Sequence, residues 1–253
     1  MRAMGQAAQQ APDVLLDRVR KLLAKAEAEG VTPAEAQALT AKAAELMAKY
    51  GIDRAVLAAE RPETDQPADR IITITNPWGR EKAHLLAGLA SAMRCQCVLL
   101  SVREGSRVHV FGYASDIERT DVLYTSVLLQ MWHGLAGATV PAWSRSPRAW
   151  RRSWLLGYAS AVISRVRAAE HGAVATATTP GAPASDRTAL VLADRSLVIR
   201  RQAERAYPVT RKARVTYSGS GYGDGYTQGQ RADIGTARLS RRPGRAITAA
   251  TSR

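Results

Sequence analysis

The chain has 253 residues, a length that suits one large domain or two modest ones. Its formal net charge is +14, and its two cysteines are too few for a disulfide framework. The sequence has no signal-peptide pattern and no uninterrupted apolar run long enough for a membrane span, so we expect a cytoplasmic protein without membrane contact.

The positive charge lies in the second part of the chain. Residues 1–140 contain 16 basic and 16 acidic side chains, whereas residues 141–253 contain 20 basic and 6 acidic ones. Nineteen of those 20 are arginines, whose planar guanidinium suits phosphate. A GC-rich genome would explain arginine in place of lysine, but it would not explain the asymmetry. The asymmetry favours contact with a polyanion.

Residues 13–53 predict two helices folded into a hairpin. Apolar residues recur at helical spacing in the first helix, which Gly30 ends. Thr32 and Glu35 form a capping box for the second helix, which we expect to end at Gly51 as a left-handed cap. Such a hairpin buries too little surface to be secure alone, so we expect it to dock on the rest of the chain or on a partner protein.

A DNA-reading helix-turn-helix is the alternative for this segment. The charge argues against it, because residues 13–53 contain six basic and seven acidic side chains. A surface with a net negative charge gains little from phosphate neutralisation.

Three stretches carry a resemblance to a known family. KLLAKAEAEGVTPAEAQALTAKAAELMAKYGI is similar to the hallmark of a bacterial and phage family named only domain of unknown function 2786. HVFGYASDIERTDVLYTSVL and RSWLLGYASAVISRV resemble the companion domain that follows it in that family. The resemblance spans about residues 13–235. It implies no catalytic residue, because the family has no established activity.

After the hairpin, residues 54–70 are polar and contain prolines, which predicts a linker. Residues 71–235 predict an α+β domain with a small, mostly antiparallel sheet covered by helices. Residues 236–253 read as a disordered basic tail.

Residues 95–113 predict a β-hairpin with a two-residue loop, in which Cys97 pairs with Gly112. Cys95 and Cys97 share one face of this hairpin, and His109 lies on the other. Zinc requires about four convergent ligands. We therefore expect no metal here and no cofactor elsewhere.

Ser115 and Glu118 form a second capping box, which opens a helix to about Leu135. Metal-binding carboxylates are one interpretation of Asp116, Glu118 and Asp121. Acidic residues in a first helical turn are favoured by the helix dipole anyway, so we favour the capping interpretation.

Residues 147–170 predict a helix with Trp150 and Trp154 on one face. That face suits a buried core, although Trp143 or Trp150 would also suit stacking on a base. Several arginines gather at the start of the helix, where positive charge is unfavourable unless an anion binds there. They are Arg145, Arg148, Arg151 and Arg152.

Residues 189–192 predict a last strand, and Asp194 is the expected cap of a helix to about residue 206. A tyrosine-rich and glycine-rich segment follows, which suits either stacking on single strands or a flexible tail. Further arginines lie in this part of the chain. They are Arg200, Arg201, Arg205, Arg211 and Arg214.

These nine arginines lead to our prediction of function. We expect a non-enzymatic nucleic-acid-binding protein, linked to phages by its family resemblance, that contacts the phosphates of DNA or RNA. One alternative is an enzyme acting on nucleic acid or a nucleotide, for which the sequence offers no convergent catalytic set. The other is a structural or assembly protein that docks a partner through the helical hairpin.

Overall fold

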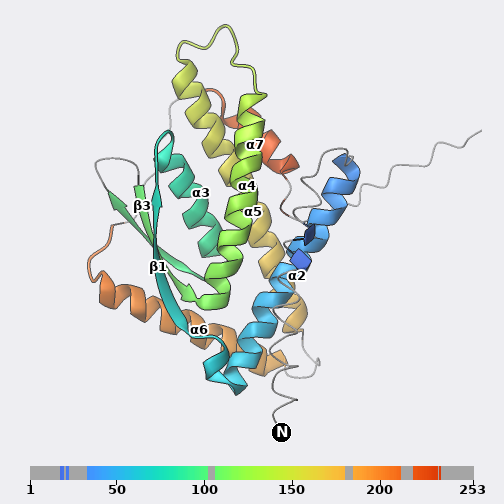
Figure 1. Cartoon of the computed structure of the whole chain (residues 1–253), viewed down its shortest axis with the longest axis vertical. Helices are drawn as coiled ribbons and strands as arrows, with labels where there is room; N and C mark the ends of the chain where they lie inside the picture. Colours follow the sequence, from blue (N-terminus) through green and yellow to red (C-terminus); the bar gives the residue numbers. More distant parts are fainter. Residues whose placement is uncertain are drawn as a thin grey trace, which may run out of the picture.

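The computed structural model describes residues 18–19, 21–22, 33–101, 106–179, 185–211, 219–232 and 234. It confirms the α+β class, because a three-stranded antiparallel sheet packs against helices (Figure 1). The elements are α2 (Pro33–Glu60), η1 (Pro62–Thr64), β1 (Pro67–Ile74), α3 (Gly79–Ala92), β2 (Gln96–Ser101), β3 (Ser106–Tyr113), α4 (Ala114–Ala136), α5 (Pro147–Ala177), α6 (Ser185–Ala206) and α7 (Tyr222–Arg231).

The sheet has the strand order β1-β3-β2, with both neighbours antiparallel to β3. Cys97 pairs with Val110, so the predicted pairing of Cys97 with Gly112 is wrong by two residues. A shift of two residues preserves the alternation of side chains between faces. The predicted separation of His109 from the cysteines therefore remains correct.

Helices cover both faces of the sheet. Val108 and Val110 of β3 belong to a small core with Leu86 of α3. His109 and Phe111 point to the opposite face, since side chains alternate along a strand. There they form ring contacts with Tyr207, which directly follows α6.

Helix α2 is longer than the sequence predicted. The expected left-handed cap at Gly51 is wrong, because the helix continues through this residue to Glu60. The segment expected as a linker, residues 54–70, therefore contains the last turns of α2, the short helix η1 and the start of β1. Gly51 is needed for packing rather than for termination, as its contacts show below.

Much of the expected first helix, residues 13–30, lies outside the described residues. Residues 18, 19, 21 and 22 are helical, and Val19 is fully buried in the main core. The expected N-cap Thr32 and the tail at 236–253 also lie outside the described residues.

Helix α6 replaces the predicted strand at residues 189–192. This prediction is wrong, and Asp194 lies inside the helix instead of capping it. Leu192, Arg195 and Ile199 are buried at positions spaced by three and four residues, which is the period of a helix. A short apolar run cannot distinguish strand from helix by itself.

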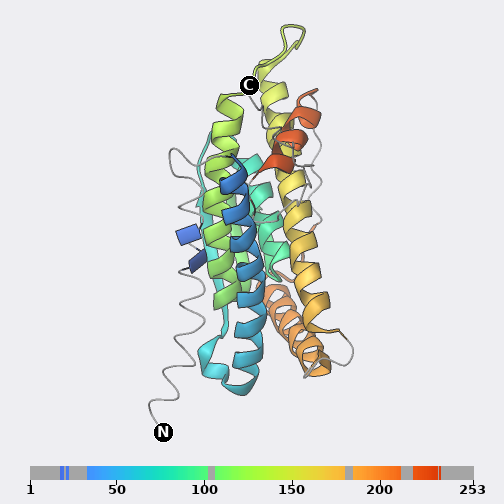
Figure 2. The ribbon, with the colours of Figure 1, turned by 90° about the vertical axis from the view of Figure 1, so that its right-hand side faces the viewer.

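Helix α5 contributes many residues to the main hydrophobic core. Trp150, Trp154 and Tyr158 are buried along it, as the predicted core face requires. Figure 2 shows that α2, α4 and α5 run roughly along the long axis of the molecule. The larger hydrophobic cluster draws residues from these helices and from α3.

Helix α7 lies parallel to the first half of α5 and packs closely against it. Gly221, Gly225 and Gly229 contact the α5 backbone at Trp150, Trp154 and Tyr158 respectively. Glycines spaced by four residues line one face of a helix. Their missing side chains let the two backbones touch, and both helices begin at the same end of the molecule.

Candidate functional site

The start of α5 concentrates exposed positive charge. Ser146 caps the helix by accepting a hydrogen bond from the Ala149 N–H at 3.2 Å, and Pro147 occupies the first turn. Arg145, Arg148 and Arg151 are exposed, and none of the three forms an ion pair with another described residue. The first turn contains no acidic side chain. Unneutralised cations therefore meet the positive end of the helix dipole.

Aromatic residues near these arginines divide into two kinds. Trp143 is 71% exposed, whereas Trp150 is only 2% exposed. Trp150 belongs to the core and has no face free for a base. Trp143 remains the only one of the two that can stack on a base.

Arg152 differs from its neighbours. Its Nε donates to Glu81 Oε1 at 2.7 Å, and the Glu81 side chain is only 6% exposed. Glu81 lies in the first turn of α3, so this pair ties α5 to α3. The arginine is thus partly committed to a bond within the protein.

The remaining predicted arginines form a second group. Arg200, Arg201 and Arg205 are exposed on α6, and Arg211 is exposed shortly after it. Arg214 lies outside the described residues. The C-terminal end of α5 leads into α6, and a helix of 31 residues is about 45 Å long. The start of α5 and helix α6 lie toward opposite ends of the molecule (Figure 1), so the arginines form two groups rather than one.

The acidic residues at the start of α4 do not meet His109 in one site. Asp116 is buried among arginines, and Asp121 forms an ion pair with Arg70 on the surface. His109 bonds to Asp69 on the far face of the sheet. These groups do not converge on one cleft.

The two cysteines are free thiols, and neither suits nucleophilic catalysis. Burial raises the pKa of Cys97 to about 12. Burial, with a smaller effect of Asp116, raises the pKa of Cys95 further. The thiolate is the reactive form of cysteine, so buried Cys95 and partly buried Cys97 are both poor nucleophiles.

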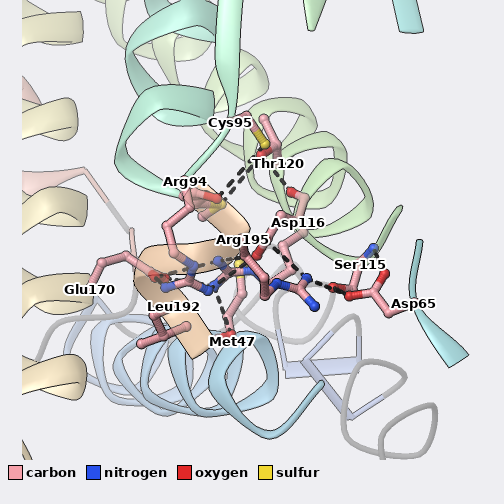
Figure 3. A network of polar contacts seen from close by, with 12 residues as sticks. Met47, Asp65, Arg94, Cys95, Ser115, Asp116, Thr120, Glu170, Leu192 and Arg195 are labelled. Atoms are coloured by element: carbon pink, nitrogen blue, oxygen red, sulfur yellow. Dashed lines mark hydrogen bonds and ion pairs between the residues drawn. The ribbon is translucent and has the colours of Figure 1, made fainter. Parts of the chain in front are cut away.

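The structure also contains a buried ionic network that the sequence did not reveal (Figure 3). It joins three arginines to three carboxylates, and each of these side chains is at most 14% exposed. Its members come from five different parts of the chain. They are Arg94, Arg119, Arg195, Asp65, Asp116 and Glu170.

Arg119 is the centre of this network and is fully buried. Its Nη1 donates to Glu170 Oε1 at 2.7 Å and to the Met47 carbonyl at 3.0 Å, while Nη2 donates to Asp116 Oδ1 at 2.8 Å. Arg94 binds the same two carboxylates at 3.1 and 3.2 Å. The bond to Met47 anchors α2 directly to α4.

Arg195 extends the network to α6. Its Nη2 lies 2.6 Å from Asp65 Oδ2 and 3.6 Å from Asp116 Oδ2, and its guanidinium carbon lies 3.4 Å from the centre of the Tyr113 ring. Asp65 also accepts bonds from the Ser115 N–H and hydroxyl at 3.0 and 2.7 Å. Asp65 thus caps α4, and the predicted capping by Ser115 is wrong.

The charges of the network balance one another. Burial alone would raise the pKa of Asp116, but Arg94, Arg119 and Arg195 together hold it below its ordinary value. The pKa of Arg119 rises in spite of burial, because Glu170 and Asp116 stabilise its charged form. Each carboxylate of the network pairs with at least one arginine, so the network acts as a clamp between helices.

A hollow of about 450 Å³ lies beside this clamp. Alanines of α2, including Ala55 and Ala58, form one wall, and Tyr113 and Asp194 contribute to the other. Asp65 and Arg195 also line it, but they already pair with each other.

Comparison with known proteins finds a family match for one segment of the chain. Residues 14–54 match the model of a family described as protein of unknown function (DUF2786), which confirms the predicted resemblance for this segment. No curated protein and no solved structure matches the chain. In the part of the chain that the structure describes, no helix is both long and apolar enough to cross a membrane.

Proposed function

We propose that this chain, with its DUF2786 segment, binds nucleic acid through arginines that contact phosphates. The observation that carries the proposal is the start of α5, where Arg145, Arg148 and Arg151 are exposed and without ion pairs among the described residues. Free helical N–H groups and guanidiniums both favour an anion at this end.

Three further features support a nucleic acid over a small anion. The parallel packing of α7 on α5 brings a second helix N-terminus to the same end of the molecule. Trp143 is 71% exposed close to the arginines and offers an aromatic face for a base. The group on α6, with Arg200, Arg201 and Arg205, provides a second contact surface for a long polyanion.

The test is a gel-shift titration over a range of salt concentrations with labelled duplex DNA, single-stranded DNA and single-stranded RNA. We expect affinity to fall steeply with salt, because binding releases counterions from the phosphates. The variant Arg145→Gln, Arg148→Gln and Arg151→Gln should bind much more weakly than the parent.

A control variant with the same loss of charge distinguishes binding at a defined surface from attraction by the net charge of the protein. Arg18, Arg61 and Arg107 are exposed and lie outside both arginine groups. Their replacement by glutamine removes the same charge and should leave most of the affinity. Equal losses in the two triple variants would show that the start of α5 has no special role.

An assembly role in which the arginines meet an acidic protein is the competing function. Polyglutamate is a suitable probe, because it carries negative charge without phosphates or bases. Binding to polyglutamate as tight as to the nucleic acids at equal salt would favour the assembly role.

A further inference from the structure

Three side chains form a continuous hydrogen-bonded line on the α6 face of the sheet. His109 Nε2 lies 2.8 Å from Asp69 Oδ2, and His109 Nδ1 lies 2.9 Å from the Tyr207 hydroxyl. Asp69 pairs with Phe111 in the sheet register, so it is a diagonal neighbour of His109 on the same face. The line therefore connects β1, β3 and the residue that follows α6.

The surroundings hold the histidine in place. Its ring lies 4.1 Å from the Phe111 ring between centroids, and its side chain is only 10% exposed. Gln202 of α6 approaches the other oxygen of Asp69 at 3.5 Å. Tyr207 packs edge-on against His109, and its backbone N–H donates to the Ala203 carbonyl at 2.8 Å.

Hydrogen-bond chemistry assigns the direction of this line. An ionised carboxylate only accepts, so the proton of neutral His109 must lie on Nε2, facing Asp69. Nδ1 then carries the lone pair and accepts the hydroxyl proton of Tyr207. An acid that orients a histidine, whose other nitrogen faces a hydroxyl, is the arrangement that activates a nucleophile.

The two ends of the line differ from its centre in exposure. Asp69 is 49% exposed, and Tyr207 is partly exposed, whereas His109 is buried. Arg205 and Arg211 flank Tyr207 in the sequence, and both are exposed. An anionic substrate drawn to the arginines of α6 would lie near Tyr207, which carries the hydroxyl of this line.

We propose that Tyr207 is a nucleophile that attacks a phosphodiester of the bound nucleic acid and forms a phosphotyrosyl ester. The Tyr207 oxygen forms a bond to phosphorus while the bond from phosphorus to one ribose oxygen breaks. His109 Nδ1 takes the tyrosine proton and releases it to solvent, and the leaving ribose oxygen takes a proton from water. The product is one strand joined to the protein and one free hydroxyl end.

In this reaction His109 is the general base, and Asp69 is a positioning residue that fixes the ring and its tautomer. Reattack of the free hydroxyl end on the phosphotyrosyl ester reverses the step and reseals the strand. The substrate class rests on the proposed function, whereas the activated tyrosine rests on the geometry of the three side chains.

The test uses the full chain and random-sequence oligonucleotides of single-stranded DNA, duplex DNA and RNA, labelled at either end. After denaturation in detergent, a labelled band that migrates with the protein reports the covalent product. Peptide mass spectrometry should place the nucleotide on Tyr207. Single-stranded substrates favour detection, because the leaving fragment diffuses away before it can reattack.

Tyr207→Phe should abolish the adduct, while its melting temperature and non-covalent binding stay close to those of the parent, since the ring contacts remain. Tyr226→Phe is the matched control on α7, where the ring is also partly exposed, and it should form the adduct normally. His109→Ala should slow adduct formation by about 10²–10⁴-fold, the usual contribution of a general base.

Asp69→Asn tests the positioning role. It should slow adduct formation at saturating nucleic acid while leaving the dissociation constant unchanged, a split that a merely structural loss would not produce. If the parent forms no adduct with any of the substrates at high concentration, the inference is wrong. Gel shifts on the same samples then report separately whether nucleic-acid binding stands.

Discussion

The Arg119 guanidinium lies directly on the backbone of Gly51, and a Cβ added at this glycine would be 2.5 Å from Arg119 Cζ. The glycine is inside α2, where alanine would otherwise be favoured by about 1 kcal/mol. Arg94 also lies against this position, with Nη2 2.6 Å from the same point.

Gly51→Ala should therefore destabilise the protein by about 1–3 kcal/mol, because overpacking outweighs helix propensity. Gly172→Ala is the control, since this α5 glycine has nothing within 4 Å of the added Cβ. It should stabilise by about 0.5–1 kcal/mol. Urea unfolding measures both variants, and stabilisation by Gly51→Ala would contradict the packing account.

Glu170 forms ion pairs with two of the buried arginines, so replacing its carboxylate by a neutral group should lower the free energy of unfolding. Glu170→Gln keeps the shape of the side chain but leaves Arg94 and Arg119 with one carboxylate fewer. We expect a loss of about 3–5 kcal/mol in the free energy of unfolding, as for other broken buried pairs. The exposed Glu204→Gln should change it by about 0.5 kcal/mol or less.

Asp116 gives the protein a defined sensitivity to acid. Burial acts to raise its pKa, but the three arginines lower it below the ordinary 3.8, so the folded carboxyl binds its proton less tightly than the unfolded one. Its contribution to stability is complete above 3.8 and disappears as the pH falls toward the folded pKa. Asp116→Asn should be less stable at neutral pH and should lose less stability on acidification. Parallel acid profiles of the two proteins would contradict this linkage.

The contact between α5 and α7 depends on glycine. A Cβ at Gly225 would collide with the Trp154 carbonyl and lie 2.8 Å from its Cα, whereas one at Gly223 meets nothing within 4 Å. Gly225→Ala should destabilise by about 1–3 kcal/mol or detach α7, while Gly223→Ala should be neutral or stabilising. Thermal unfolding followed by tryptophan fluorescence distinguishes the pair, because Trp154 is at the contact.

Arg148 and Arg152 should behave differently although they are one turn apart. Arg148→Gln should reduce the slope of log affinity against log salt for duplex DNA by about 0.9, the value for one lost phosphate contact. Arg152→Gln should change this slope less and should instead cost about 1–3 kcal/mol of stability, because it leaves buried Glu81 without its partner. Identical slopes for both variants would contradict the assignment of separate roles.

Local patterns predicted much of the fold. The start of α5 at Pro147 and the buried tryptophan face follow from local patterns alone. The faces of the β-hairpin were also correct, even though the register was wrong, since an error of two residues does not exchange faces. These features depend on residues that are close in the sequence.

Several predictions failed where contacts between residues far apart in the sequence determine the structure. Gly51 resembles a helix cap until Arg94 and Arg119 are seen against it. Ser115 resembles an N-cap, but Asp65, 50 residues earlier, takes that role. Arg195 lies 130 residues from Asp65, and no periodicity connects them. The spacing of Gly221, Gly225 and Gly229 was the one overlooked signal that the sequence did contain.

The candidate site follows the same division. Charge asymmetry predicted exposed arginines. Eight of the nine lie in the described part of the chain, and among these eight only Arg152 bonds to a carboxylate, that of Glu81. Composition could not foresee their division between the ends of α5 and α6. Nor could it foresee that Asp69, His109 and Tyr207 meet, because only the strand pairing and the path of α6 bring them together.

The bond from Arg119 to the Met47 carbonyl, beside Gly51, has a consequence for the comparison of related sequences. In the segment that matches the family model, one side packs against side chains that lie outside the segment. Related chains that keep a glycine at the position of Gly51 should also keep the arginines at the positions of Arg94 and Arg119 and an acidic residue that pairs with them. Chains that lack those three side chains should have room for a larger side chain at the glycine position.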